Sequence, residues 1–390
     1  MQTSSRANID PFIVMDVMEA ARALEVGGRS IIHMEVGQPG TPAPAAARRA
    51  LGRALETDAL GYTVALGLPE LRAGIADLYR RWYGISLDPA RVIVTSGSSA
   101  AFLLAFTALF DAGDRVALGL PGYPSYRQIL KALSLAPVGL ATRAQDRYQP
   151  TPDQITATPG LSGLILASPG NPSGTMLDRP ALGALIAAAQ ARGLSVISDE
   201  IYHGLHYGAR AVSALEISDD VCVINSFSKY FSMTGWRVGW MVVPEALVRP
   251  IERLAQNMFI CPPHASQIAA LAALGAVAEC EANRAVYAEN RRLMLDGLPK
   301  AGFTRIAPPD GAFYVYADVS DITTDSRAFC AEVLAKAGVA ITPGLDFDPE
   351  RGHQTVRFSY ARSTQDIAEG LDRLTRFMAG ARPPRLTRPG

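Results

Sequence analysis

Short apolar runs alternate with longer helical patterns through the middle of the chain. Six runs have the pattern of buried strands: RVIVTS (91–96), RVALGL (115–120), GLILAS (163–168), LSVISD (194–199), VCVINS (221–226) and GWMVV (239–243). Amphipathic or alanine-rich stretches, such as 100–110 and 179–193, lie between several of them. This repeated order of strand, crossover helix and strand predicts an α/β fold with a mostly parallel sheet covered by helices on both faces.

The pattern changes from about residue 288. A helical stretch leads to an apolar strand pattern at 311–319, a helix near 326–337, a further strand pattern at 355–361 and a last helix. We therefore expect a large domain over 37–287 and a smaller α+β domain over 288–390. The segment 1–36 has no evident strand partner in the large domain, so we expect it to contribute to the small domain or to an interface.

Polar, glycine or proline clusters follow five of the predicted strands: GSSA, PGYPSY, PGNPSG, DEIY and FSK. Ligands of such sheets bind beyond the carboxyl ends of the strands. One unusual cluster would mean little, but five at the same edge predict a site.

Lys229 follows the fifth of these strands and Arg237 lies shortly after it. Desolvation and a nearby cation both lower the pKa of an ammonium group, which leaves some neutral amine able to attack a carbonyl. Arg237 could supply that cation or bind phosphate oxygens, with Ser226 and Ser228 as hydroxyl donors. The alternative is that Lys229 and Arg237 are surface charges on a loop.

Three other clusters allow both a chemical and a purely structural interpretation. Ser98 and Ser99 open a helix whose N–H groups suit an anion, or one of them is an N-cap. Asp199 ends a buried strand, where a carboxylate requires a cation or strong donor, although it could cap a helix or pair with the backbone. Tyr202 could reach the same site or only pack in the core.

Asn171 lies in a proline-rich turn and could donate to a ligand oxygen, or serve only the turn. Tyr123 could stack on a flat ring or be a core aromatic. A phosphate pocket, an imine-forming amine, a carboxylate for a ring nitrogen, donors for a ring oxygen and a stacking aromatic are together what a pyridoxal phosphate site requires.

The composition of the chain limits the kinds of binding partner to be expected. Lysine plus arginine and aspartate plus glutamate both number 37, so no basic surplus indicates nucleic acid or an anionic membrane. The four cysteines form no metal-binding pattern and are expected to be reduced thiols. No signal-peptide pattern or membrane-spanning run is present, so a cytoplasmic protein that binds small molecules or itself is expected.

Nearly the whole chain, from about residue 9 to 363, resembles the class I/II aminotransferases, which are fold-type I pyridoxal phosphate enzymes related to aspartate aminotransferase. The segments that carry the resemblance are VGQPG (36–40), GYTVALGLPELR (61–72), PGYPSY, SPGNPSGT, SDEIY, SFSKYFSMTGWRVG, GAFY and VRFSYA. The resemblance implies a seven-stranded, mostly parallel sheet in the large domain and a homodimer with shared active sites.

The resemblance also implies roles for single residues. Lys229 would form the imine with the cofactor and move the proton, Asp199 would hold the ring nitrogen, Asn171 and Tyr202 the ring oxygen, and Tyr123 would stack on the ring. The phosphate would be held by Ser98, Ser99, Ala100, Ser226, Ser228 and Arg237, with Tyr62 reaching the phosphate of the neighbouring subunit. Arg357 would bind the substrate α-carboxylate with the backbone of Gly37, and Asn171 would also contact the substrate. Pro121 and Pro172 would be cis, and no metal is implied.

The expected activity is transfer of an amino group from an L-amino acid to a 2-oxo acid, most simply 2-oxoglutarate. The sequence departs from the family pattern at the apolar PFIVMDV, at Asp348 and at His264, and it offers no clear second arginine for a distal carboxylate. These departures favour a neutral or aromatic amino donor over aspartate. A C–S β-lyase on the same scaffold is an alternative, and a non-enzymatic regulator is a more remote one, since only some thirty residues precede VGQPG.

Overall fold

The computed structural model describes residues 1–381 and divides into two compact units. The first unit comprises residues 1–11, 38–285 and 309–312, and the second comprises residues 12–37, 286–308 and those from 313 onward. Helix α10 (Val277–Lys300) belongs to both. None of the helices in residues 1–381 combines the length and the apolar character that crossing a bilayer requires.

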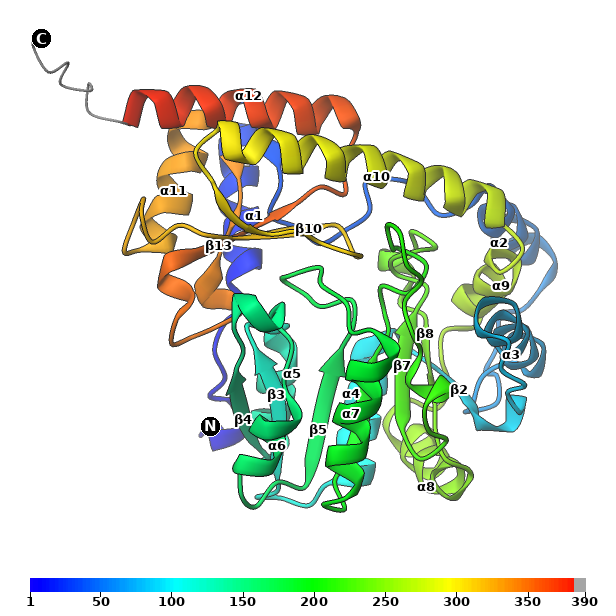
Figure 1. Cartoon of the computed structure of the whole chain (residues 1–390). Helices are drawn as coiled ribbons and strands as arrows, with labels where there is room; N and C mark the ends of the chain where they lie inside the picture. The colour runs from blue at the N-terminus through cyan, green and yellow to red at the C-terminus, as the bar shows by residue number, and fades with distance from the viewer. Residues whose placement is uncertain (382–390) are drawn as a thin grey trace, which may run out of the picture. The chain divides into compact units, whose positions relative to one another are not determined.

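The first unit is built on a seven-stranded sheet with the order β2-β8-β7-β6-β5-β3-β4 (Figure 1). The strands are β2 (Val92–Thr95), β3 (Arg115–Leu120), β4 (Ala136–Ala141), β5 (Gly163–Ala167), β6 (Ser195–Asp199), β7 (Cys222–Ser226) and β8 (Gly239–Val242). Only β8 runs antiparallel to its neighbours β7 and β2. The predicted α/β fold with a mostly parallel seven-stranded sheet is therefore confirmed.

Helices cover both faces of this sheet (Figure 1). The helices of this unit are α2 (Ala45–Thr57), α3 (Pro69–Tyr83), α4 (Ser98–Leu109), α5 (Pro124–Ala132), α6 (Pro152–Ala157), α7 (Arg179–Gln190), α8 (Glu245–Met258) and α9 (His264–Ala273). Of these, α2 packs on α9 and not on the sheet. Helices α4 and α8 pack over β7 and β8 around a core that includes Phe106, Ile224 and Met241. Helix α7 packs on β6 from the other side. Apolar burial on both faces explains why these strands have continuous apolar sequences.

Local sequence fixes several helix ends. Asp178 accepts a hydrogen bond from the backbone N–H of Ala181 at the start of α7, and Thr151 and Gln154 form a capping box at α6. Helix α3 begins with Pro69 and ends at Gly84, whose φ of 73° is the left-handed conformation that glycine adopts without strain.

The second unit contains a four-stranded antiparallel sheet with the order β12-β13-β10-β9 and a parallel pair β1-β11. Its elements are α1 (Ile13–Val26), β1 (Ile32–His33), β9 (Arg305–Ala307), β10 (Tyr314–Asp318), α11 (Ser326–Ala337), β11 (Val339–Ala340), β12 (Thr342–Pro343), β13 (Thr355–Ser359) and α12 (Thr364–Ala381). The N-terminal segment pairs with this unit through β1.

Helix α1 has no capping side chain of its own, because its N-cap is Phe12. Asp346, far along the chain, takes that role and accepts hydrogen bonds from the N–H groups of Ile13 at 3.0 Å and Val14 at 3.2 Å. A carboxylate at a helix N-terminus also interacts favourably with the helix dipole. The loop after β12 therefore fixes the start of α1.

Candidate functional site

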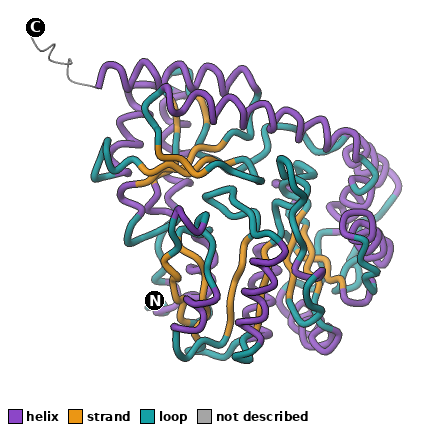
Figure 2. Tube along the Cα trace, viewed as in Figure 1, coloured by secondary structure: helices purple, strands orange, loops and turns teal. Residues whose placement is uncertain are grey.

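Loops gather where the parallel strands of the first unit end (Figure 2). Asp199 is the last residue of β6 and Ser226 is the last of β7. Because β8 is antiparallel, its first residue, Gly239, lies at this same edge and pairs with both Ser226 and Thr95. The predicted site residues of the first unit, apart from Tyr62, therefore lie in or beside the segments that meet at this edge.

Lys229, Tyr202 and Asp199 come together there. The Nζ atom of Lys229 lies 5.7 Å from the centroid of the Tyr202 ring. The positive charge of Lys229 also lowers the pKa of Asp199, so the two groups share one electrostatic environment. Lys229 is half-buried, whereas Asp199 and Tyr202 are buried. An amine and a carboxylate are thus held at the same edge of the sheet.

Asp199 is held by two hydrogen bonds. Its Oδ1 accepts from the backbone N–H of Ile201 at 3.0 Å, and its Oδ2 accepts from the hydroxyl of Tyr126. Burial raises the pKa of Asp199 to about 6, although Tyr126, Ile201 and Lys229 each act in the opposite direction. The sequence allowed a pairing of Asp199 with a backbone group, and its hydrogen bond from the N–H of Ile201 is such a pair. The raised pKa shows that this bond does not fully stabilise the buried carboxylate. Such a group suits a cationic ligand.

The start of α4 provides exposed N–H groups. Its N-cap is Gly97, with φ 80°, and Gly97 has no side chain to cap the helix. The interpretation of Ser98 or Ser99 as the N-cap is therefore wrong, because both serines already lie within the helix. Ser98 is half-buried, Ser99 is exposed and Ala100 is buried in the same first turn. The helix start is thus available to an anion.

The guanidinium of Arg237 lies against this helix start. A Cβ placed on Gly97 would be only 2.4 Å from Nη2 of Arg237, so the guanidinium occupies the space that a side chain at position 97 would fill. Arg237 has φ 50° and donates from Nη1 to the carbonyl oxygen of Thr234 at 2.9 Å. It is exposed, as the surface-charge interpretation expected, yet its guanidinium faces a helix N-terminus.

Two buried serines adjoin this region. The Oγ atoms of Ser226 and Ser228 are 2.7 Å apart, and the N–H of Ser228 donates to Oγ of Ser226 at 3.1 Å. Ser226 also donates to the carbonyl oxygen of Val238 at 3.1 Å. Helix N–H groups, hydroxyls and a guanidinium are together the donor set of a phosphate site.

Tyr123 and Asn171 lie in the loops after β3 and β5. Tyr123 packs against the core and meets Tyr126 edge to face, with ring centroids 5.3 Å apart. Asn171 is 9% exposed and, with Tyr126, lines a small hollow between these loops. Pro121 and Pro172 are preceded by cis peptide bonds, as the resemblance implied, and so is Pro169.

The second unit holds Gly37 and Arg357. The guanidinium carbon of Arg357 lies 4.3 Å from the ring centroid of Tyr314 and 4.7 Å from that of Phe347, and its Nη2 donates to the carbonyl oxygen of Glu35. A Cβ on Gly37 would be 1.9 Å from the hydroxyl oxygen of Tyr314. Arg357 is therefore clamped between two aromatic rings, and position 37 excludes any side chain.

Tyr62 and Asp348 differ in their surroundings from the other positions that the sequence singled out. Tyr62 is 83% exposed, so it is accessible to another molecule. Asp348, which departs from the family pattern, is buried and pairs with Arg351 at 2.7 Å, which gives it a structural role within its loop. Tyr126 was not among the site residues predicted from the sequence. The signal that was available is its spacing of three residues from Tyr123 at a helix start.

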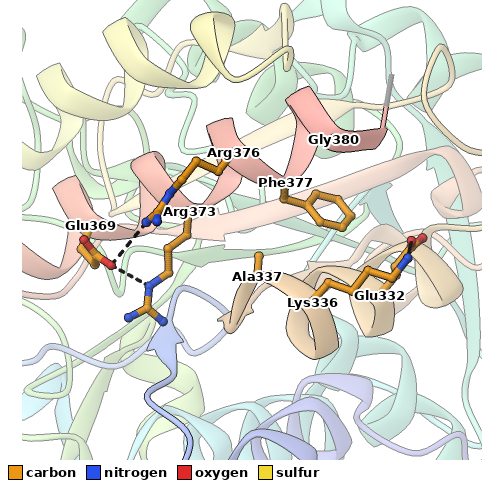
Figure 3. A pocket seen from close by; sticks show the side chains of 8 residues that line it. All are labelled: Glu332, Lys336, Ala337, Glu369, Arg373, Arg376, Phe377 and Gly380. Carbon is orange, nitrogen blue, oxygen red and sulfur yellow. Dashed lines mark hydrogen bonds and ion pairs between the residues drawn. The ribbon is translucent and has the colours of Figure 1, made fainter. Parts of the chain in front are cut away.

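A larger hollow of about 660 Å³ lies between α11 and α12 of the second unit (Figure 3). Its charged side chains are already paired, Lys336 with Glu332 at 2.6 Å and Arg373 with Glu369 at 2.8 Å. None of the predicted site residues lines it. The edge of the seven-stranded sheet remains the better candidate for chemistry.

Comparison with known proteins identifies the family to which this chain belongs. The family model described as aminotransferase class I and II matches residues 29–374. The valine–pyruvate aminotransferase of Mycobacterium tuberculosis is 50% identical over 374 residues, which cover 95% of this chain and 96% of that protein.

Two solved structures share the fold over nearly their full lengths. An aminotransferase from Mycobacterium tuberculosis has 48% identity and a TM-score of 0.95, with 97% of this chain and 100% of that chain covered. Aspartate aminotransferase from Thermus thermophilus with maleate has 31% identity and a TM-score of 0.91, with 96% and 99% covered. The chain belongs to the class I and II aminotransferases, which are pyridoxal phosphate-dependent enzymes.

Proposed function

We propose that this aminotransferase moves the amino group of an L-amino acid to a 2-oxo acid, with 2-oxoglutarate as acceptor and with Lys229 as the covalent (Schiff-base) anchor of the cofactor. The observation that carries the proposal is the placement of Lys229 and Asp199 in one electrostatic environment at the loop edge of the sheet. An aldehyde cofactor with a protonated ring nitrogen requires both groups.

The donors at the start of α4 fit the phosphate of this cofactor. In our proposal the N–H groups of α4 and the side chains of Ser98, Ser226 and Arg237 would hold it, with Ser99, Ala100 and Ser228 beside them. The close approach of Arg237 to Gly97 supports this assignment, because a Cβ at position 97 would fill the space next to the guanidinium.

Asp199 fits the ring nitrogen. A buried carboxylate whose pKa is raised to about 6 gains most from a cationic partner, and a protonated ring nitrogen is such a partner. The hydrogen bond from Tyr126 favours the ionised form of Asp199 and so helps to keep the carboxylate ready for that partner. Asp199 would thereby hold the proton on the ring nitrogen.

The remaining residues would orient the ring. Tyr123 is placed in the loop after β3 for stacking, and Asn171 and Tyr202 have amide and hydroxyl donors for the ring oxygen. When bound, the cofactor withdraws electrons from the carbon that carries the amino group and makes its hydrogen acidic. The Nζ atom of Lys229, once released, is the base that would take that proton and return it elsewhere.

Arg357 would bind the α-carboxylate of the substrate with the backbone of Gly37. A guanidinium can bind a carboxylate through two parallel hydrogen bonds, and the rings of Tyr314 and Phe347 fix its plane. We further propose a neutral amino donor. The name of the valine–pyruvate relative supports this choice and makes pyruvate the acceptor to compare with 2-oxoglutarate.

The central test replaces Lys229 by alanine. K229A should lose the visible absorbance of the covalently bound cofactor and all but a small fraction of the turnover, at least about 1,000-fold. K131A is the matched control, because Lys131 is exposed and pairs with Asp10 on the surface. Amino-acid and oxo-acid panels on the wild type then identify donor and acceptor. A K229A enzyme with wild-type turnover would refute the proposal.

We also propose a homodimer in which Tyr62 reaches the phosphate site of the partner. Tyr62 lies in an exposed apolar region with Val64 at 57%, Met258 at 44% and Ile260 at 52% exposure. A hydrogen bond of 3.1 Å between His264 and the carbonyl oxygen of Gly61 fixes the segment that carries Tyr62. Sedimentation should give twice the monomer mass. In addition, mixed dimers of K229A and Y62F subunits should recover activity in one of the two sites.

A further inference from the structure

His203 is a buried histidine with no role in the proposed chemistry. It directly follows Tyr202, is 2% exposed, and has a partner on each ring nitrogen. Nδ1 lies 2.6 Å from the hydroxyl oxygen of Tyr83 and Nε2 lies 2.9 Å from the carbonyl oxygen of Ser168. The ring therefore connects the end of α3 with the loop that follows β5.

The partners determine the tautomer. A carbonyl oxygen only accepts hydrogen bonds, so Nε2 carries the hydrogen and Nδ1 accepts from the hydroxyl of Tyr83. Burial lowers the pKa of His203 to about 3, which keeps the ring neutral. The charged or titratable groups around it are Glu200, whose Oε2 is 3.5 Å from Nδ1, Arg210, which lies over the Tyr83 ring at 5.1 Å, His206 and Glu216.

Ser168 begins the turn that presents Asn171. Within this turn the N–H of Gly170 donates to the carbonyl oxygen of Thr175 at 3.0 Å, and the N–H of Gly174 donates to that of Gly170 at 2.8 Å. The turn is thus closed on itself, and the bond from His203 to Ser168 ties it to the segment that carries Tyr202. Asn171 and Tyr202 are the two residues assigned above to the ring oxygen of the cofactor.

We propose that His203 is a positioning residue that holds Asn171 and Tyr202 at a fixed distance from each other, with Tyr83 fixing its ring. This inference rests on the proposed function, because the two residues it aligns are the proposed donors to the ring oxygen. A neutral imidazole ring that makes one hydrogen bond through each nitrogen is suited to the task, since its one donor and its one acceptor are both used.

The test compares two substitutions whose side-chain amides take the place of different ring nitrogens of His203. The amide of asparagine reaches about as far as Nδ1, so H203N keeps a partner for Tyr83 and loses the bond to Ser168. The amide of glutamine reaches about as far as Nε2, so H203Q keeps the bond to Ser168. H206N is the matched control on the same segment, because Nδ1 of His206 has no hydrogen-bond partner within residues 1–381.

The readout is the pH midpoint of the visible absorbance of the bound cofactor. Hydrogen-bond donors stabilise the ionised ring oxygen of the cofactor and so lower the pH at which the bound cofactor loses its proton. When these donors are misplaced, the pH midpoint rises. We expect H203N to raise it by at least about half a pH unit, and H203Q and H206N to stay within about 0.2 units of wild type. Y83F, which leaves the histidine in place, should give a smaller rise and serves if H203N does not fold.

Each other outcome has a defined meaning. An unchanged midpoint in H203N, or equal shifts in H203N, H203Q and H206N, would overturn the positioning role. If H203N does not fold, an unchanged midpoint in Y83F would overturn it as well. Absence of the visible band in the wild type would instead count against the proposed function, so the two failures are distinguishable.

Discussion

The hydroxyl of Tyr126 donates a hydrogen bond to Oδ2 of Asp199, and both side chains are buried. Tyr126 comes from the first turn of α5 and Asp199 from the end of β6, so tertiary packing brings them together. Burial raises the pKa of the Tyr126 hydroxyl well above its usual value, and the carboxylate of Asp199 raises it further. Tyr126 therefore keeps its hydroxyl proton, and remains a donor, at neutral pH.

Loss of the Tyr126 hydroxyl should weaken the support that Asp199 would give to the protonated ring nitrogen of the cofactor. Y126F removes a donor to the carboxylate, so the ionised form of Asp199 becomes less stable and the protonated ring nitrogen loses part of its support. We expect kcat/KM to fall about 10-fold, which corresponds to about 1.4 kcal/mol and is typical of a hydrogen bond to a charged group. Steady-state kinetics with the best amino donor measures this. Y79F is the control and should retain wild-type kinetics, because Tyr79 is a buried tyrosine of α3 whose hydroxyl accepts a hydrogen bond from Trp240 at 3.3 Å.

Gly97 should be intolerant of alanine for a reason beyond its backbone angle. A Cβ at this position would lie 2.4 Å from Nη2 of Arg237 and would displace the guanidinium from the start of α4. We expect G97A to raise the Kd for pyridoxal phosphate by about 10-fold or more, as measured by fluorescence titration of the cofactor-free enzyme. G84A is the control, because Gly84 has a similar φ of 73° and nothing within 4 Å of its Cβ position. Equal losses of affinity in the two variants would assign the effect to backbone strain alone.

The carboxyl of Glu200 should make the cofactor-free enzyme less stable as pH rises. Burial raises the pKa of Glu200 from 4.5 to about 8, even though Ser213 and the N–H of Ala214 donate to it. Between these two pH values the folded state holds a proton that the unfolded state has released. The free energy of unfolding therefore falls as pH rises from about 4.5 to about 8.

E200Q removes this titration. Over the same pH interval, wild type should lose about 1–3 kcal/mol of unfolding free energy relative to E200Q. Urea unfolding of the cofactor-free proteins at several pH values measures the difference. E245Q, a change at an exposed carboxyl, should follow the wild-type curve. Parallel curves for wild type and E200Q would show that Glu200 does not titrate in this interval.

The sequence predicts the architecture well where elements are apolar on both faces. All six predicted strands of the large sheet are present, because continuous apolar runs bounded by turn residues are typical of buried parallel strands. Strand β4 was not predicted. It is the edge strand next to β3 and is largely half-buried or exposed, so its sequence, APVGLA, lacks that apolar signal.

The site was harder to predict at the level of contacts. The residue types after each strand identify Lys229, Asp199 and Asn171 as candidates, because catalytic groups of such sheets follow the strands. Tyr126 and His203 lie in or next to the same clusters, but their hydrogen-bond partners are 73 and 35 residues distant and could not be predicted from the sequence. The same applies to Asp346, whose capping of α1 joins segments more than 300 residues apart in sequence.

The reversed direction of β8 has a consequence for how this enzyme could change. Strands β7 and β8 form a hairpin in which Ser226 pairs with Gly239, and the connection between them contains both Lys229 and Arg237. The amine and the guanidinium are thus carried by one connection, residues 227–238, anchored at both ends by the same strand pair. Because Lys229 and Arg237 each lie close to one of these paired strand ends, the register of β7 against β8 sets their separation, and a shift of that register would alter it.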